Sequence, residues 1–212
     1  MSDRKSYAQF CGLARSLDHV GDRWTLLVVR ELLLGDRTFR ELEEALAGIS
    51  PSLLAKRLAE MGDDGLVARN DAPQRSPNVR YALTEAGRAL EPVIVGLIRW
   101  GTRWMLAGPG DDLVDPRWAP LALKALLEDG ASVRGRVHLD VDGIAITVDA
   151  LAGRRRVTPG HHGRAGATVS ASLPALLAVV ADAVPLAASG ASTTGDRSLA
   201  TAMLAPPAQR GP

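Results

Sequence analysis

Small, hydroxyl and basic side chains share the outer face of a helix that the sequence predicts from Pro51 onward. Ser50 is a favourable N-cap, and proline suits the first helical position because its missing N–H would lack an intrahelical partner there anyway. The inner face is apolar, and the outer face carries Ser50, Ser52, Ala55, Lys56 and Ala59. Small residues permit close approach to a duplex, whereas hydroxyl and ammonium groups reach phosphates and base edges. This face therefore fits the major groove of DNA, although an ordinary helical hairpin with a solvated face would show the same pattern.

A second helix, just upstream, must position that face. Thr38 is a good N-cap with Glu41 as its capping-box partner, and the apolar stripe of this helix is Phe39, Leu42 and Leu46. Downstream, strand-like residues 66–69 and 79–83 flank a loop that contains two prolines and the basic residue Arg75. A basic loop between two short strands, directly after two such helices, is typical of a winged helix, whose wing contacts the DNA backbone or minor groove. We expect DNA contacts from Thr38, Arg40, Ser50, Ser52, Lys56, Arg57, Arg69, Arg75, Asn78 and Arg80.

The sequence at this point resembles the HxlR family of bacterial winged-helix regulators. The matching segments, in order and at the family spacing, are CGLAR at 11–15, GDRWTL at 21–26, REL at 30–32, FREL at 39–42, GISPSLL at 48–54, KRL at 56–58, GLV at 65–67 and YALTEAG at 81–87. The resemblance implies a dimeric DNA-binding transcription factor, commonly a repressor and sometimes an activator, that responds to small molecules or to thiol oxidation.

The overall charge and composition narrow the class of protein further. Lys and Arg number 25 against 24 Asp and Glu, a formal net charge of +1, so any affinity for DNA must come from local placement of charge. The single cysteine excludes an intramolecular disulfide, which suits a reducing compartment. There is no N-terminal targeting signal and no apolar run long enough to cross a bilayer. We therefore expect a soluble, cytoplasmic protein with no membrane partner.

The long helix expected after the wing suggests a dimer interface. Thr84 is its predicted N-cap, Pro92 is expected to kink it slightly, and it should continue to about Ala107, the end of a first domain spanning 1–107. Its apolar stripe includes Leu97, Trp100 and Trp104. These side chains could fill an intramolecular core, but buried aromatic anchors are also favoured at interfaces. The family resemblance favours a homodimer formed by this helix together with the N-terminal one.

Cys11 has two interpretations. The resemblance to thiol-responsive members of the family makes it a candidate redox sensor that forms an intersubunit disulfide or a mixed adduct. The alternative is a small, half-buried residue near the dimer contact, because only Arg15 lies one helical turn away to lower its pKa. We favour the structural alternative because a separate sensing domain is predicted.

That sensing domain is expected at residues 112–204, after a Gly- and Pro-rich linker and before a disordered tail at 205–212. The sequence predicts a helix at 117–128, an antiparallel sheet with strands near 133–141, 144–148, 154–158 and 167–171, and helices at 173–183, 184–189 and 196–204 around a short strand at 191–194. The order resembles the sterol-carrier-protein-like α+β fold. That resemblance implies an apolar tunnel for a small hydrophobic effector, with candidate lining residues Trp118, Leu121, Leu126, Leu139, Ile146, Leu176, Leu177 and Val180. A closed core made of the same residues is the alternative.

Catalytic and metal-binding patterns are weak in this sequence. His161 and His162 lie in a Gly-rich loop without a cysteine or carboxylate at ligand spacing, so we expect no metal and no cofactor. No Ser-His-Asp order, phosphate-binding glycine loop or carboxylate pair stands out. The predicted protein is therefore an α+β, winged-helix regulator that binds double-stranded DNA as a homodimer and is not an enzyme. The alternatives are a redox switch through Cys11 and, less favoured, a lipid-binding or enzymatic C-terminal domain.

Overall fold

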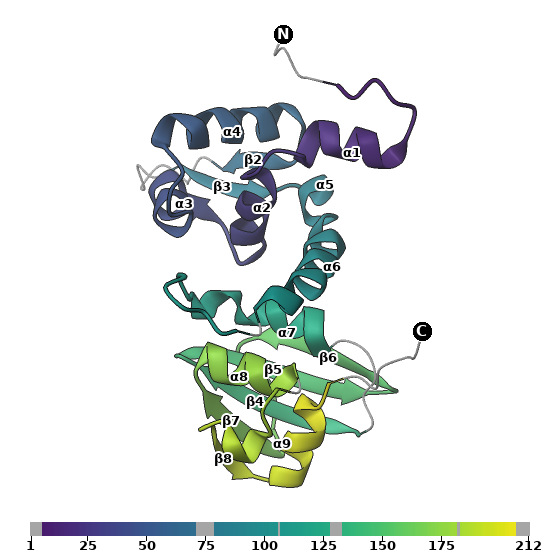
Figure 1. Cartoon of the computed structure of the whole chain (residues 1–212), viewed down its shortest axis with the longest axis vertical. Coiled ribbons are helices and arrows are strands. Elements are labelled where there is room, and N and C mark those ends of the chain that lie inside the picture. The colour runs from purple at the N-terminus through teal and green to yellow at the C-terminus, as the bar shows by residue number, and fades with distance from the viewer. Residues whose placement is uncertain (1–5, 71–78, 106, 128–132, 182, 207–212) are drawn as a thin grey trace. The chain divides into compact units, whose positions relative to one another are not determined.

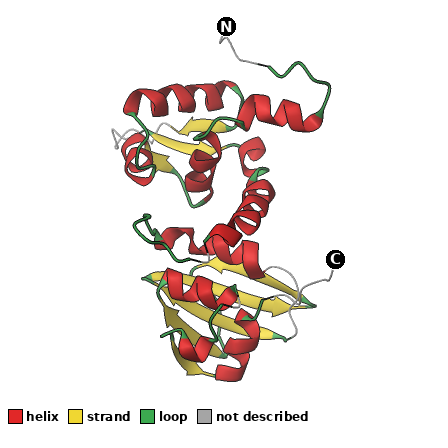
Figure 2. Ribbon diagram, viewed as in Figure 1, coloured by secondary structure: helices red, strands yellow, loops and turns green. Residues whose placement is uncertain are grey.

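The chain divides into two compact units, residues 1–94 and 95–212, each of which combines helices and strands (Figures 1 and 2). The structure is a computed structural model that describes residues 6–70, 79–105, 107–127, 133–181 and 183–206. The predicted α+β class is confirmed at this level, with a winged helix-turn-helix in the first unit and a sheet in the second. The domain limits 1–107 and 112–204 stay predictions, and residues 207–212 of the expected tail lie outside the described residues.

The first unit contains the predicted helix pair and the two strands of the wing. Its elements are α1 (Gly12–Val20), α2 (Thr25–Leu33), β1 (Arg37–Thr38), α3 (Phe39–Ala45), α4 (Pro51–Asp63), β2 (Val67–Asn70), β3 (Arg80–Leu83), α5 (Glu85–Arg88) and the first turn of α6 (Glu91–Gly101). The strands form an antiparallel sheet in the order β1-β3-β2. Val28, Val29 and Leu32 of α2 are buried, as its apolar composition predicts. Together these elements hold α3 and α4 against a common core.

The single long helix expected from Thr84 to Ala107 is wrong. Thr84 does cap a helix, since its hydroxyl accepts a hydrogen bond from the Gly87 N–H at 3.1 Å, but that helix, α5, ends at Arg88. Pro92 is the second residue of the next helix, α6. Proline has no N–H to donate to the carbonyl four residues back, and its ring crowds that carbonyl, so the first helix cannot continue through it. Pro92 therefore separates two helices instead of kinking one, and α6 gives way to the 3₁₀ turn η1 (Thr102–Trp104).

The second unit is a five-stranded sheet with helices packed on it. After α6 and η1 its elements are η2 (Pro116–Trp118), α7 (Ala119–Leu127), β4 (Gly135–Val141), β5 (Ile144–Leu151), β6 (Arg154–Pro159), β7 (Ala167–Ala171), α8 (Leu173–Val180), η3 (Leu186–Ala188), β8 (Ser192–Gly195) and α9 (Arg197–Leu204). The strand order is β6-β5-β4-β7-β8. The expectation of a purely antiparallel sheet is wrong, because β7 runs parallel to β4. After the β4-β5-β6 meander the chain passes through residues 160–166 to the far side of β4, and β7 then runs in the same direction as β4.

The core of this unit lies on one face of its sheet. Val137 pairs with Val148 and Leu139 with Ile146, so the buried residues of β4 and β5 point the same way. Side chains of α7, α8 and α9 join them in one cluster of buried residues. The opposite face is polar, and there Arg136 Nε donates to Asp149 Oδ1 at 2.6 Å across the β4–β5 ladder. The predicted alternation of apolar and polar residues thus sets which face the helices cover.

Candidate nucleic-acid interface

Side-chain caps fix where α3 and α4 begin. Thr38 Oγ1 accepts the Glu41 N–H at 3.2 Å, and Glu41 Oε2 accepts the Thr38 N–H at 2.6 Å, which completes the predicted capping box. Ser50 Oγ accepts the Leu53 N–H at 3.3 Å, with Pro51 at the first helical position. Both helix starts are therefore confirmed. Thr38 and Ser50 use their hydroxyl oxygens as acceptors here, and Ser50 Oγ also lies 3.3 Å from Ser52 Oγ.

The outer face of α4 is open, as the proposed contact with DNA requires. Ser52, Ala55, Lys56 and Ala59 are all exposed. The Lys56 side chain is 68% exposed, and its Nζ lies 4.0 Å from Glu60 Oε1. An exposed ion pair at this distance contributes little to stability, so Lys56 can leave Glu60 for a DNA phosphate at low cost. This face thus combines small residues, a hydroxyl and an ammonium group that can leave its present partner.

Arg57 is mostly buried, unlike Lys56, and ion-paired, and its predicted role as a phosphate contact stays a prediction. Its side chain is only 15% exposed, and Nη2 donates to Asp22 Oδ2 at 2.6 Å while Nη1 lies 2.7 Å from Glu60 Oε2. Two carboxylates therefore hold the guanidinium, one from the loop before α2 and one from the next turn of α4. The Glu60 partner was visible in the sequence at the i+3 position, but the longer-range partner Asp22 was not. Arg57 fastens α4 to the rest of the unit.

Arg40 is exposed on α3 and forms a local ion pair. Its Nε donates to Glu44 Oε1 at 2.8 Å, and this hydrogen bond raises the pKa of the Arg40 guanidinium. Both side chains are mostly exposed, so water competes with the pair and its contribution is small. Arg40 can therefore exchange Glu44 for a phosphate at little cost. Its predicted contact with DNA stays a proposal.

The wing strands place Arg69 and Arg80 differently. Arg69 is exposed on β2. Arg80 on β3 donates from Nη2 to the Asp36 carbonyl at 2.5 Å and lies 3.4 Å from Glu41 Oε2. The Glu41 carboxylate accepts the Thr38 N–H and, less strongly, faces the charges of Arg80 and Arg37, so the pKa of Glu41 is lowered. Arg80 thus ties the wing to the start of α3, and the other two wing candidates, Arg75 and Asn78, lie outside the described residues.

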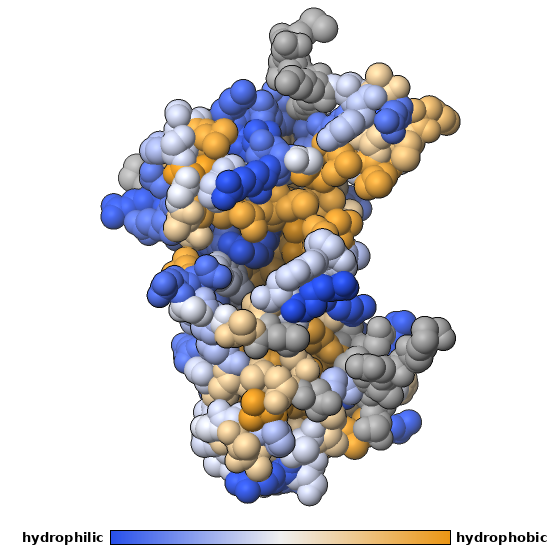
Figure 3. Space-filling model, viewed as in Figure 1, coloured by the Kyte–Doolittle hydropathy of each residue, from blue (hydrophilic) through white to orange (hydrophobic). Residues whose placement is uncertain are grey.

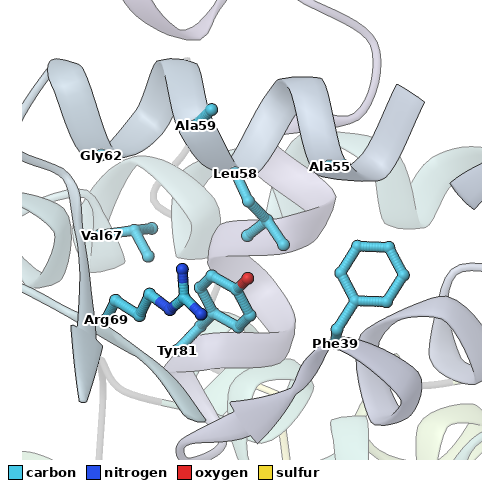
Figure 4. A pocket seen from close by; sticks show the side chains of 8 residues that line it. All are labelled: Phe39, Ala55, Leu58, Ala59, Gly62, Val67, Arg69 and Tyr81. Atoms are coloured by element: carbon cyan, nitrogen blue, oxygen red, sulfur yellow. The ribbon is translucent and has the colours of Figure 1, made fainter. Parts of the chain in front are cut away.

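A hollow beside α4 is the feature that the sequence analysis missed. It lies between α4, the wing strands and α3, and Figure 4 shows its lining residues Phe39, Ala55, Leu58, Ala59, Gly62, Val67, Arg69 and Tyr81. The available signal was the spacing of Ala55, Ala59 and Gly62 by four and three residues, which aligns small side chains along one side of a helix. We call this hollow the α4 pocket.

The predicted dimer residues expose apolar surface along α6 and η1. Leu97, Trp100 and Trp104 are 44%, 56% and 62% exposed. The two indole rings meet edge to face with centroids 4.5 Å apart, and the Arg103 guanidinium lies 5.3 Å from the Trp104 centroid. Around α1, Phe10, Leu13 and Leu17 are also exposed, and Figure 3 shows apolar surface there. Exposed aromatic and aliphatic groups of this kind are typical of surfaces that a partner covers.

Cys11 is exposed, so the expectation of a half-buried side chain is wrong. It precedes the first turn of α1, where Phe10, Gly12 and Leu13 are exposed as well. The backbone N–H groups of Ala14 and then Leu13, at the start of α1, lower the pKa of the Cys11 thiol. The N-terminus of a helix supplies such donors without any neighbouring cation, so the thiol does not need Arg15 to lower its pKa.

The candidate effector-binding residues of the second unit lie in or against its core. Leu121, Leu139, Ile146, Leu176 and Val180 are at most 3% exposed. Leu126 and Leu177 are partly buried and pack against the same core, and Trp118 lies in η2. This arrangement is compatible with the closed-core alternative, and the apolar tunnel stays a prediction.

The histidine loop packs on the polar face of the same sheet. The rings of His138 and His161 stack with centroids 4.2 Å apart, and His161 Nε2 lies 3.3 Å from Asp140 Oδ1. Across the described ranges, no three or more histidine, cysteine or acidic side chains converge as metal ligands would. Within the same ranges, the helices lack the combination of length and apolar composition that spanning a bilayer requires.

Sequence comparisons assign the chain to a family. The sequence model of the HxlR-like helix-turn-helix family matches residues 19–108. The uncharacterized HTH-type transcriptional regulator YvaP of Bacillus subtilis is 35% identical over 43% of this chain and 84% of its own length, and sll1512 of Synechocystis sp., described in the same words, is 34% identical over 45% and 70%. Among solved structures, the reduced form of the transcriptional regulator YodB from B. subtilis is 32% identical, covers 47% of this chain and 99% of its own, and has a TM-score of 0.41. The open, capped α4 face beside a two-stranded wing is thus found in a chain that belongs to the HxlR-like family of helix-turn-helix transcriptional regulators.

Proposed function

We propose that the protein binds operator DNA as a homodimer and represses transcription from that site, with α4 in the major groove. The observation that carries this proposal is the open face of α4, where Ser52, Ala55, Lys56 and Ala59 are exposed together beside the wing. Ser50 and Thr38 at the helix starts, Arg40 on α3 and Arg69 on β2 add donors for phosphates around it. The net charge of +1 makes this local placement the source of DNA affinity.

Dimerisation would place two α4 helices on one duplex. The exposed Leu97, Trp100 and Trp104 supply an apolar surface for it, together with the exposed side chains of α1. Two recognition helices then contact half-sites about one DNA turn apart. Sedimentation of the wild type and of Trp104→Glu tests this step, because a buried carboxylate at an apolar interface should shift the protein to monomer. A Trp104→Glu protein that stays dimeric would place the interface elsewhere.

We further propose that the second unit responds to a small hydrophobic effector, as its resemblance to the sterol-carrier-protein-like fold implies. Its sheet carries an apolar face under three helices, and Leu126 and Leu177 at the edge of that core are only partly buried. A ligand that binds one dimer geometry better than another shifts the population toward it and changes the spacing of the two α4 helices. Oleate binding to the full chain that Leu177→Glu abolishes would support this step, and oleate binding that leaves operator affinity unchanged would contradict it.

Fluorescence anisotropy on DNA from upstream of the protein's own gene, in a salt series, tests the central proposal. Lys56→Ala should weaken binding about tenfold and lower the salt slope by about 1 if the ammonium neutralises one phosphate. Arg88→Ala is the matched control, because Arg88 is an exposed cation of α5 outside the proposed face. Equal losses in the two variants would show only a general charge effect, and no preference for that duplex over random DNA would count against an operator at this site.

A redox switch through Cys11 is a second candidate function, which the exposure of its thiol and its lowered pKa support. Thiolate is the reactive form, so the backbone donors of α1 favour oxidation. In the presence of an oxidant such as diamide, two Cys11 thiols of a dimer would each lose a proton and together two electrons to form one disulfide. Release of DNA by diamide in the wild type but not in Cys11→Ser, with a dimer band on a non-reducing gel, is the expected result. An unchanged diamide response in Cys11→Ser would remove this candidate.

A further inference from the structure

The α4 pocket has the composition of a small-molecule site within the first unit. Leu58 and Val67 are buried at its base, and the aromatic side chains of Phe39 and Tyr81 are half-buried at its sides (Figure 4). The small residues Ala55, Ala59 and Gly62 leave the α4 side unobstructed. It is a half-open hollow of about 350 Å³, at the lower end of the volumes of small-molecule sites. Apolar residues and two rings around such a space favour a flat aromatic ligand.

One charged residue indicates which charge the ligand should carry. Arg69 is the single cation among the eight lining residues, and none of the eight is acidic. On the antiparallel ladder it lies directly opposite Tyr81, which places the guanidinium beside one of the aromatic rings (Figure 4). Among the described residues, Arg69 forms no ion pair with a carboxylate, in contrast to Arg57 and Arg80. A guanidinium offers a planar pair of donors that matches a carboxylate.

We propose that the α4 pocket binds a small aromatic carboxylate, with the ring between Phe39 and Tyr81 and the carboxylate on Arg69. This would be a second effector site, independent of any ligand in the second unit. Binding itself does not depend on the proposed function. Competition with DNA does, since Ala55 and Ala59 belong both to this pocket and to the proposed DNA-contacting face of α4. A ligand seated there covers the small residues that allow a duplex to approach.

Isothermal titration of the full-length protein with 1-naphthoate, without DNA, tests the binding step. One site per chain is expected, with affinity at least tenfold lower in Arg69→Gln and unchanged in Arg88→Gln, which removes an exposed arginine outside the pocket. The neutral analogue 1-naphthylmethanol should bind at least tenfold more weakly than 1-naphthoate to the wild type, because it cannot pair with the guanidinium.

A second variant tests the location independently of charge. Ala59→Leu fills the pocket from an exposed helical position, where leucine is a good helix former, so the unit should still fold with an unchanged circular dichroism spectrum. It should abolish 1-naphthoate binding. Absence of saturable binding to the wild type at millimolar 1-naphthoate overturns the proposal, and so does binding that survives both Arg69→Gln and Ala59→Leu.

A displacement assay then separates this inference from the proposed function. In a complex of wild-type protein with its operator, 1-naphthoate should release the duplex, and the neutral analogue 1-naphthylmethanol at the same concentration should not. If 1-naphthoate binds the pocket while the duplex stays bound, the competitive effect is overturned and the binding site stands. If no duplex binds at all but 1-naphthoate does, the proposed operator binding fails and the pocket assignment is retained.

Discussion

The candidate functional residues of the two units differ in their exposure to solvent. In the first unit, Ser52 and Lys56 are exposed on a helix whose start is fixed by a side-chain cap. In the second unit, Leu139 and Ile146 are 0% exposed within a shared core. The first set was chosen for the chemistry of its side chains and the second for apolar periodicity. Apolar periodicity therefore predicts that a residue is buried. It does not distinguish a residue that lines a cavity from one that fills a core.

The largest expected effect in this comparison is on the stability of the second unit. Leu139→Ala should lower the free energy of unfolding by about 3 kcal/mol, because it removes buried methyl groups and leaves a void. Leu151→Ala is the matched control, since Leu151 is 68% exposed at the end of β5 and its loss should cost less than about 0.5 kcal/mol. Urea unfolding followed by circular dichroism measures both. A cost below about 1 kcal/mol for Leu139→Ala would indicate open space beside it, as a ligand tunnel requires.

The adjacent residues Lys56 and Arg57 of α4 provide a second comparison between an exposed and a mostly buried side chain. Arg57→Ala should lower the free energy of unfolding by about 1 to 2 kcal/mol, because Asp22 and Glu60 lose the guanidinium that pairs with both of them in a partly buried setting. Lys56→Ala, whose side chain is 68% exposed, should change it by less than about 0.5 kcal/mol. The same urea titration compares the two. A loss of DNA affinity in Arg57→Ala at unchanged stability would instead support its predicted contact with phosphate.

Local rules accounted for the elements that position the candidate DNA-contacting face. Thr38 and Ser50 were predicted as N-caps from residue type and spacing, and both accept the expected backbone N–H. The strands predicted at 133–141 and 144–148 leave two residues for a hairpin turn, and both of them, Asp142 and Gly143, have positive φ. Each of these predictions depends on residues within a few positions of each other, where steric and hydrogen-bonding preferences act directly.

Features that depend on residues far apart in the sequence were missed. Whether an arginine faces solvent or a distant carboxylate depends on the tertiary placement of Asp22 relative to Arg57, 35 residues away. The parallel pairing of β7 with β4 likewise follows from the path of the chain, since an alternating strand has the same pattern in either direction. The α4 pocket combines α3, α4 and both wing strands, so no single periodic segment contains it. The lowered pKa of the Cys11 thiol was missed because only cations, and not helix N–H groups, were considered.

A smaller effect is expected from the cap of α3. Thr38→Ala should lower the free energy of unfolding by about 1 kcal/mol, since the Glu41 N–H loses its acceptor at 3.2 Å. Thr38→Ser, which keeps the hydroxyl, is the matched control and should restore most of the difference. Thermal unfolding measures it. If Thr38→Ala costs stability but leaves DNA affinity intact, Thr38 positions α3 without contacting DNA. If both variants lose DNA affinity equally, the threonine methyl group matters more than the cap.

The smallest expected effect is the acid dependence that Glu41 gives to the same cap. Its pKa is lowered below the ordinary value of 4.5 in the folded unit, mainly by the Thr38 N–H, so the carboxylate stabilises the fold above that value. The stabilisation is lost as the pH falls from 4.5 through the lower folded pKa, because protonation then favours the unfolded chain. The stability difference between wild type and Glu41→Gln should therefore be full at pH 7 and shrink toward pH 3. Glu43→Gln on the same helix is the control, and a difference for Glu41→Gln that stays constant from pH 7 to pH 3 would show that its charge contributes nothing to the wing and α3.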